Sequence, residues 1–212
     1  MWEILFQNQN FVAINKPCHI AVHQEENQIS LTQTLAAQLS LERVWLLHRL
    51  DKATSGVLLL ALNEQTASEL GQQFSAKTMR KTYFALSDTK PSKKQGWIKG
   101  GMEKSRRGAW KLTRDMANPA ITQFHSHAIA PNLRLFVLQP HTGKTHQLRV
   151  AMKSLGSPIL GDELYGGTPA ERMYLHAWKI EFQHRGEHFK ITAPLDTIWP
   201  SEYIYAELSP SL

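Results

Sequence analysis

The sequence predicts an α+β fold, in which a mixed but mostly antiparallel sheet is flanked by helices. Segments typical of strands outnumber helical ones and mostly follow one another along the chain, which favours antiparallel pairing. A length of 212 residues is enough to bury a substantial core, and we expect a single domain over residues 1–212.

Short apolar or alternating runs, bounded by turn residues, predict the strands. They are residues 3–7, 11–15, 57–62, 81–87, 121–129, 133–138, 173–182 and 188–191. Val57–Leu62 is apolar throughout and predicts a buried central strand. Pro131-Asn132 predicts a hairpin turn between two of the strands.

Apolar residues at helical spacing predict the helices, with Ser30 as a cap before the first and Gly156 as a stop after the last. Their apolar stripes are Leu31, Leu35 and Leu39, then Ala67, Leu70, Gly71 and Phe74, then Leu148, Ala151, Met152 and Leu155.

The composition excludes several classes of protein. No apolar stretch approaches the roughly 20 residues that span a bilayer, and the start Met1–Leu5 lacks the pattern of a signal peptide. Cys18 is the only cysteine, so neither an internal disulfide nor a cysteine-based zinc site can form. We expect a cytoplasmic protein that does not bind membranes, and a monomer.

Positive charge is concentrated in one segment. Residues 90–114 hold nine basic side chains against the single carboxylate of Glu103, which gives +8 and leaves −2 for the rest of the +6 chain. Trp97 and Trp110 lie in this basic, insert-like segment, which we delimit as residues 91–119. Clustered cations with aromatic rings suit phosphate contacts and base stacking, although a solvated β-insert has the same composition.

Asp51 lies where a tight turn is expected. It stands before Thr54-Ser55-Gly56 and between Arg49 and Lys52, and an apolar strand begins a few residues later. An isolated aspartate in such a turn usually bonds nearby backbone N–H groups. Its place at the mouth of a buried strand also suits a reactive carboxylate.

A series of short motifs extends from about residue 3 to about residue 195. The motifs are Asn15-Lys16-Pro17 with His23, His48-Arg49-Leu50-Asp51, Lys81-Thr82-Tyr83, the run from His141 to Arg149, Gly161-Asp162, Tyr165-Gly166 and Leu175-His176-Ala177. In this order they resemble the motif series of the RluA-type pseudouridine synthases. The resemblance implies a pseudouridine synthase-like fold with a central active-site cleft.

The resemblance also implies the chemistry. Asp51 matches the catalytic aspartate, whose carboxylate attacks the target uridine at C1′ of the ribose or at the base. The uracil detaches from N1, rotates and rejoins through C5. No redox change occurs, so no cofactor is expected.

Three further residues match pocket positions of the family. Arg149 matches the arginine that pairs with the aspartate, and a nearby cation favours the ionised carboxylate. Tyr83 matches a tyrosine that could stack on the uracil and assist proton removal at C5. Leu175 matches an apolar residue that closes the pocket. Without the resemblance, a surface arginine, a core tyrosine and a core leucine are the simpler interpretations.

Other positions match residues that contact RNA, since a uridine must leave its stack before any side chain reaches it. By the resemblance these are Arg49, His48, Lys16, His23, Lys81, Lys144 and His146. Lys144 stands where many members have arginine, so it offers phosphate a point charge rather than a fork. We expect no S4-type RNA-binding domain before the catalytic domain.

Rival motifs fail. Gly143-Lys144-Thr145 resembles the end of a P-loop, but Leu138 stands where the first glycine is required. The histidines show no His-Glu-x-x-His pattern, so we expect no metal, and Gly-x-Ser-x-Gly is absent.

The sequence therefore predicts an isomerase, an RNA pseudouridine synthase acting on structured RNA, either large-subunit ribosomal RNA or transfer RNA. The alternative is an RNA-binding or assembly factor that kept the fold and lost the chemistry. Presence of Asp51, Tyr83 and Arg149 together favours the enzyme.

Overall fold

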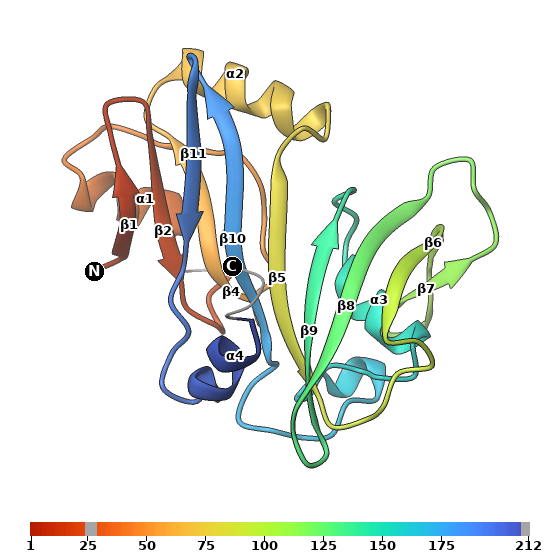
Figure 1. Cartoon of the computed structure of the whole chain (residues 1–212). Coiled ribbons are helices and arrows are strands. Elements are labelled where there is room, and N and C mark those ends of the chain that lie inside the picture. Colours follow the sequence, from red (N-terminus) through yellow and green to blue (C-terminus); the bar gives the residue numbers. More distant parts are fainter. Residues whose placement is uncertain (24–28, 209–212) are drawn as a thin grey trace. The chain divides into compact units, whose positions relative to one another are not determined.

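A computed structural model describes residues 1–23 and 29–208 (Figure 1). The chain divides into two compact units. The first consists of Met1–Lys81 and Ala177–Pro194, and the second of Thr82–His176 and Leu195–Leu212. Each unit therefore combines segments that are distant in the sequence. No helix in the described part of the chain is long and apolar enough to cross a membrane.

The first unit is a sheet with two helices. Its strands run in the order β1-β2-β4-β10, with β11 paired to β10 and β3 paired to β4. Their bounds are β1 Glu3–Gln7, β2 Phe11–Lys16, β3 Trp45–Leu46, β4 Ser55–Ala61, β10 Leu175–His184 and β11 Glu187–Thr192. The first two residues of β10 belong to the second unit. The helices are α1 Leu31–Gln38 and α2 Glu64–Ser75. Where the register is known, β1–β2, β2–β4, β3–β4 and β10–β11 are antiparallel.

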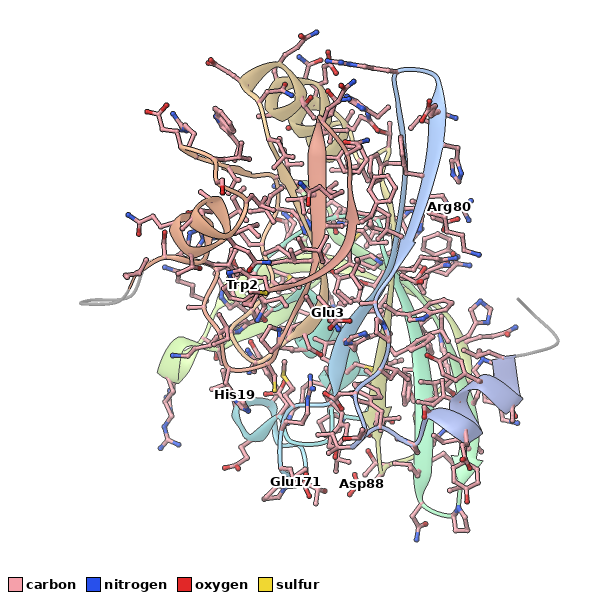
Figure 2. All side chains as sticks on the ribbon, turned by 90° about the vertical axis from the view of Figure 1, so that its left-hand side faces the viewer. Trp2, Glu3, His19, Arg80, Asp88 and Glu171 are labelled. Carbon is pink, nitrogen blue, oxygen red and sulfur yellow. The ribbon has the colours of Figure 1, made fainter. Side chains whose placement is uncertain are left out.

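The core of the first unit lies between its sheet and α2, since Leu70 of α2 packs with Leu59 of β4 and Phe182 of β10. Every residue of β4 is buried, as the apolar run predicted. Ser30 and Gln33 form a capping box at the start of α1. The indole of Trp2, whose position is labelled in Figure 2, donates to Thr34 Oγ1 over 3.0 Å. This bond ties the start of the chain to α1.

The second unit has the strand order β5-β9-β8-β6-β7, and these pairs are antiparallel. Their bounds are β5 Arg80–Ser87, β6 Gln95–Lys104, β7 Trp110–Thr113, β8 Ala120–Ala130 and β9 Leu133–Pro140. The helices are α3 Gln147–Ser154 and α4 Ser201–Leu208, with 3₁₀ turns η1 Arg106–Gly108 and η2 Glu163–Tyr165. Helix α3 packs against β7, β8 and β9, and α4 packs against β8.

The predicted α+β class with a mostly antiparallel sheet is confirmed, as are the three predicted helices. The single domain and the central cleft stay predictions. Three strands or helices were missed: β3, α4 and most of β6. Strand β6 belongs to the sheet, because it pairs with β8 from Gln95 to Gly100, whereas the sequence suggested only short strand-like patches.

Glycine explains why β6 escaped prediction. Gly100 and Gly101 interrupt the apolar pattern, and a Cβ at Gly100 would lie 2.5 Å from the carbonyl oxygen of Thr113. The glycine thus permits the close approach of β7, while it removes the side chain on which a strand pattern depends.

Candidate active site

Asp51 lies in a tight turn directly before β4. The amide of Thr54 donates to the Asp51 carbonyl oxygen over 2.9 Å, and β4 begins at the next residue. The Asp51 side chain is half-buried. At Gly56, φ is +112°, and a Cβ there would lie 2.2 Å from the Ala177 carbonyl oxygen. The turn is therefore followed by a close backbone contact between β4 and β10.

Lys16 has a different surrounding from the one expected of an RNA contact. Its side chain is fully buried, and its ammonium donates to the carbonyl oxygens of Pro17, Ile20 and Lys52 over 2.8, 2.8 and 3.3 Å. A buried ammonium requires such partners. Lys16 therefore ties the loop after β2 to the turn that carries Asp51, which argues against direct contact with RNA.

His48 also points into the protein. Its Nε2 accepts from the amide of Leu59 over 3.0 Å, and its ring stacks on Phe74 with centroids 4.8 Å apart. Burial, and then the charge of Lys81, lower the pKa of His48 to about 3. The imidazole is therefore neutral at physiological pH and is used as an acceptor inside the first unit, which argues against a cationic contact with phosphate.

Two of the remaining predicted contacts in this unit lie together at the surface. The Arg49 guanidinium is 3.0 Å from His23 Nε2, and both side chains are exposed. Lys81, at the start of β5, is half-buried, and burial lowers the pKa of its ammonium. Arg49 and His23 thus keep the accessibility that an RNA contact needs.

In the second unit, buried Gln147 organises the loop before α3. Its Oε1 accepts from the Thr142 hydroxyl over 2.7 Å and from the Lys144 amide over 3.1 Å. Its Nε2 donates to the carbonyl oxygen of Ile121 and the hydroxyl of Thr122 on β8. One amide therefore fixes the path of the chain from β9 to the first turn of α3.

Two neighbours hold the side chain of Arg149. Its Nε and Nη2 donate to the two carboxylate oxygens of Asp162 over 2.8 and 2.7 Å, and its guanidinium carbon lies 4.9 Å from the centroid of the Tyr165 ring. The Asp162 side chain is 1% exposed. A bidentate pair and an aromatic face together fix the plane of the guanidinium.

The hydroxyl of Tyr165 continues this network. It accepts from the amide of Trp110 over 2.9 Å and lies 2.8 Å from His146 Nδ1. His146 precedes α3 in the left-handed conformation, with φ +56°. Tyr165 therefore joins the start of β7 to the start of α3 and to Arg149.

The segment that carries Asp162 is tied to β5, the strand of Tyr83. The amide of Leu160 donates to the Leu86 carbonyl oxygen, and the amide of Tyr174 donates to the carbonyl oxygen of Leu160. Leu175 follows directly and is buried. Tyr83 lies opposite Leu138 of β9 and is 9% exposed. The second unit thus brings Arg149, Tyr83 and Leu175 onto connected elements.

Asp162, Tyr165 and Gln147 received no role from the sequence, although each stands in a quoted motif. In those motifs they stand beside glycine, histidine and arginine residues. That placement could have marked them as site residues, but it does not indicate which side chains they contact. Among the described residues, no group of three or more His, Cys, Asp and Glu side chains could hold a metal ion.

Comparison with known proteins decides the family. A family model described as RNA pseudouridylate synthase matches residues 10–154, which include Asp51, Tyr83 and Arg149. The chain belongs to the RNA pseudouridylate synthase family. It is therefore an isomerase that acts on RNA, as the motif series predicted.

Full-length relatives support the same family. The "Uncharacterized RNA pseudouridine synthase" of Haemophilus influenzae is 54% identical over 90% of this chain and 86% of its own length. The tRNA pseudouridine synthase C of Vibrio vulnificus is 32% identical over 94% of this chain and 93% of its own.

A solved structure agrees with the fold of this pseudouridine synthase. Human RNA Pseudouridylate Synthase Domain Containing 4 is 26% identical, with a TM-score of 0.78, over 98% of this chain and 93% of that chain.

Proposed function

We propose that this pseudouridine synthase isomerises a uridine of structured ribosomal or transfer RNA with Asp51 as its nucleophile. The C1′–N1 bond breaks, the uracil turns, and a C1′–C5 bond forms. The proton of C5 leaves and N1 gains one, so no oxidant is needed. Asp51 attacks either C1′ of the ribose or the base.

The setting of Asp51 is the observation that carries the proposal. The residue sits in a hydrogen-bonded turn at the edge of a strand that is buried throughout, next to the close contact of Gly56 with β10. A carboxylate there is held on rigid backbone, which suits a nucleophile that must meet one atom of its substrate. Lys16 stabilises the same turn through the Lys52 carbonyl oxygen.

Arg149 is proposed as the cation that pairs with Asp51. A guanidinium has five N–H donors, of which the Asp162 pair uses two. Because Asp162 balances the charge of Arg149, the orientation of the guanidinium matters for Asp51 as much as its charge does. Arg149→Lys keeps the charge and loses the fork, so we expect kcat to fall at least about 100-fold with a smaller change in KM.

Tyr83 and Leu175 complete the proposed pocket. A phenol on the rigid strand β5 can stack on uracil and assist removal of the C5 proton. Leu175 supplies an apolar wall that excludes water. Of the basic residues, Arg49, His23, Lys81, Lys144 and His146 remain candidates for RNA contact.

Names of relatives suggest two kinds of substrate. Proteins from Rickettsia conorii, 36% identical over 91% of this chain, and Vibrio vulnificus are named for large-subunit ribosomal RNA and for tRNA. Pseudouridine mapping of total RNA from cells with and without this gene would identify the position. We further propose a cytoplasmic monomer, which gel filtration and cell fractionation test.

Asp51→Asn tests the nucleophile. We expect it to keep the fold and RNA affinity while pseudouridine formation in total RNA falls below detection. Asp115→Asn, at an exposed aspartate of the same chain, is the control and should leave the rate unchanged. Continued isomerisation by Asp51→Asn would contradict the assignment. Incubation with RNA containing 5-fluorouridine gives a second readout, since the wild type should form a long-lived or rearranged product and Asp51→Asn should not.

A further inference from the structure

Trp97 is an exposed aromatic ring on the middle of a paired strand. It is 50% exposed, whereas its neighbour Ile98 is 8% exposed. The alternation places Gln95, Trp97 and Lys99 on one face of β6. Burial of a tryptophan would contribute far more to stability than exposure does, so this position gains little for the fold.

The indole is nevertheless held in place. The ring of His141 lies beside it, with centroids 4.9 Å apart and planes at 47°. The Lys99 ammonium lies 5.2 Å from the indole centroid. An exposed ring that is fixed by two neighbours loses little freedom on binding a planar ligand, which favours recognition.

Directly across from the exposed face of β6, strand β8 presents two polar side chains beside Trp97. Gln123 of β8 lies opposite Trp97, and His125 lies opposite Gln95 (Figure 1 shows β6 beside β8). Amides and imidazoles can bond the edges of a base, and a lysine can meet the adjacent phosphate. Two acidic side chains lie farther along and are each paired, Glu103 of β6 with Lys111 and Glu207 of α4 with His127 of β8, and neither lies directly beside Trp97 in the register.

We propose that Trp97 is a stacking platform for an unpaired nucleobase of the substrate RNA, flanked by Lys99 and His141. Bases inside a duplex do not present their faces, so the ligand is a base of a loop, a bulge or a displaced neighbour of the target. The proposal rests on the function proposed above and assigns a role to the basic 91–119 segment. His141 also begins the loop, fixed by Gln147, that leads into α3 and Arg149.

The position of Trp97 in the second unit suggests how the platform would help to place the substrate. A base stacked on Trp97 would hold the RNA on the same unit as Tyr83 and Arg149. Sequence preference from stacking is weak, because every base has a π-face. The platform therefore selects an unpaired nucleotide near the target uridine rather than a particular base.

Equilibrium binding of the whole protein tests the platform with two RNAs of equal length, a stem-loop and a fully paired duplex. We expect Trp97→Ala to raise the Kd for the stem-loop about 10-fold, which is the loss of one stacked base. The Kd for the duplex should stay within about two-fold. Trp97→Phe should restore most of the affinity, since it keeps a ring. An equal loss on both RNAs, or no loss, would overturn the proposal.

Two controls keep the result specific. Trp45→Ala removes another tryptophan that has a cation over its ring, Arg43 at 4.5 Å. It should not change the Kd for the stem-loop and the Kd for the duplex by different factors. Lys99→Met should reduce the slope of log Kd against log salt by about one, and an unchanged slope would contradict the phosphate contact. Because binding is measured without turnover, a failure of Asp51 as the nucleophile would leave this test intact.

Discussion

The guanidinium of Arg149 and the carboxylate of Asp162 form a buried bidentate pair, with contacts of 2.8 and 2.7 Å between residues 13 apart in the chain. The pair connects α3 with the segment that leads to η2. Its second neighbour, the Tyr165 ring, comes from η2 itself. The orientation of Arg149 is therefore determined by a short stretch of chain that the sequence left without a role.

Asp162→Asn should destabilise the protein by about 3 kcal/mol, because it leaves a largely buried guanidinium without its counter-charge. It should also lower kcat, since the plane of Arg149 is no longer fixed. Urea unfolding gives the first quantity and single-turnover isomerisation the second.

Glu103→Gln is the matched control for Asp162→Asn. It breaks the exposed pair of Glu103 with Lys111, whose side chains are 62% and 61% exposed. An exposed pair contributes about 0–1 kcal/mol, so both stability and kcat should hardly change. Equal losses in the two variants would show that the buried pair has no special role.

Gly56→Ala should be severely destabilising, because φ is +112° and the new Cβ would lie 2.2 Å from the Ala177 carbonyl oxygen. We expect a loss of at least about 3 kcal/mol in urea unfolding, or an insoluble protein. Gly71→Ala is the opposite case. It lies inside α2 with nothing within 4 Å of the new Cβ, and it should stabilise by about 0.5–1 kcal/mol. A tolerated Gly56→Ala would mean that β4 and β10 can separate.

Local rules predicted much of the fold. The apolar run at residues 57–62, the Ser30 cap and the Pro131-Asn132 turn depend on neighbours in sequence, and each was found. The turn at Asp51 belongs to the same class. Helix α4 and strand β6 were missed because their patterns are interrupted by polar residues or glycine, so only tertiary contacts define them.

The motifs named candidate site residues but not the partners of their side chains. Motifs identified Arg149, whereas its pairing with Asp162 depends on how the chain folds back after α3. The motifs likewise suggested that Lys16 and His48 face RNA. In the structure Lys16 donates to the carbonyl oxygens of Ile20 and Lys52, and His48 accepts from the Leu59 amide. Burial of this kind has no signature in the local sequence.

His48 makes the first unit sensitive to acid. Its pKa is about 3 in the folded protein and about 6.5 when unfolded, so the unfolded chain binds more protons between these values. The contribution of neutral His48 to the free energy of unfolding is fully present above pH 6.5. It falls by up to about 1.4 kcal/mol for each pH unit below that value.

His48→Gln tests that contribution, because the glutamine oxygen can accept from the Leu59 amide and cannot be protonated. We expect the urea midpoint of the wild type to fall more steeply than that of His48→Gln between pH 7 and pH 5. His188→Gln, at an exposed histidine, should keep the wild-type slope. Parallel slopes for wild type and His48→Gln would show that other groups cause the acid sensitivity.

Tyr165 has two separable functions, one through its hydroxyl and one through its ring. Tyr165→Phe removes the acceptor of the Trp110 amide and should cost about 1–2 kcal/mol, with faster hydrogen exchange at Trp110. Because the ring still covers Arg149, kcat should fall less than about 10-fold. Tyr165→Leu removes both, so its kcat should fall further, and its stability should also fall more because the buried ring is lost. Tyr203→Phe, at a side chain that is 59% exposed, is the control. If the two Tyr165 variants had equal kcat, the ring would have no part in directing Arg149.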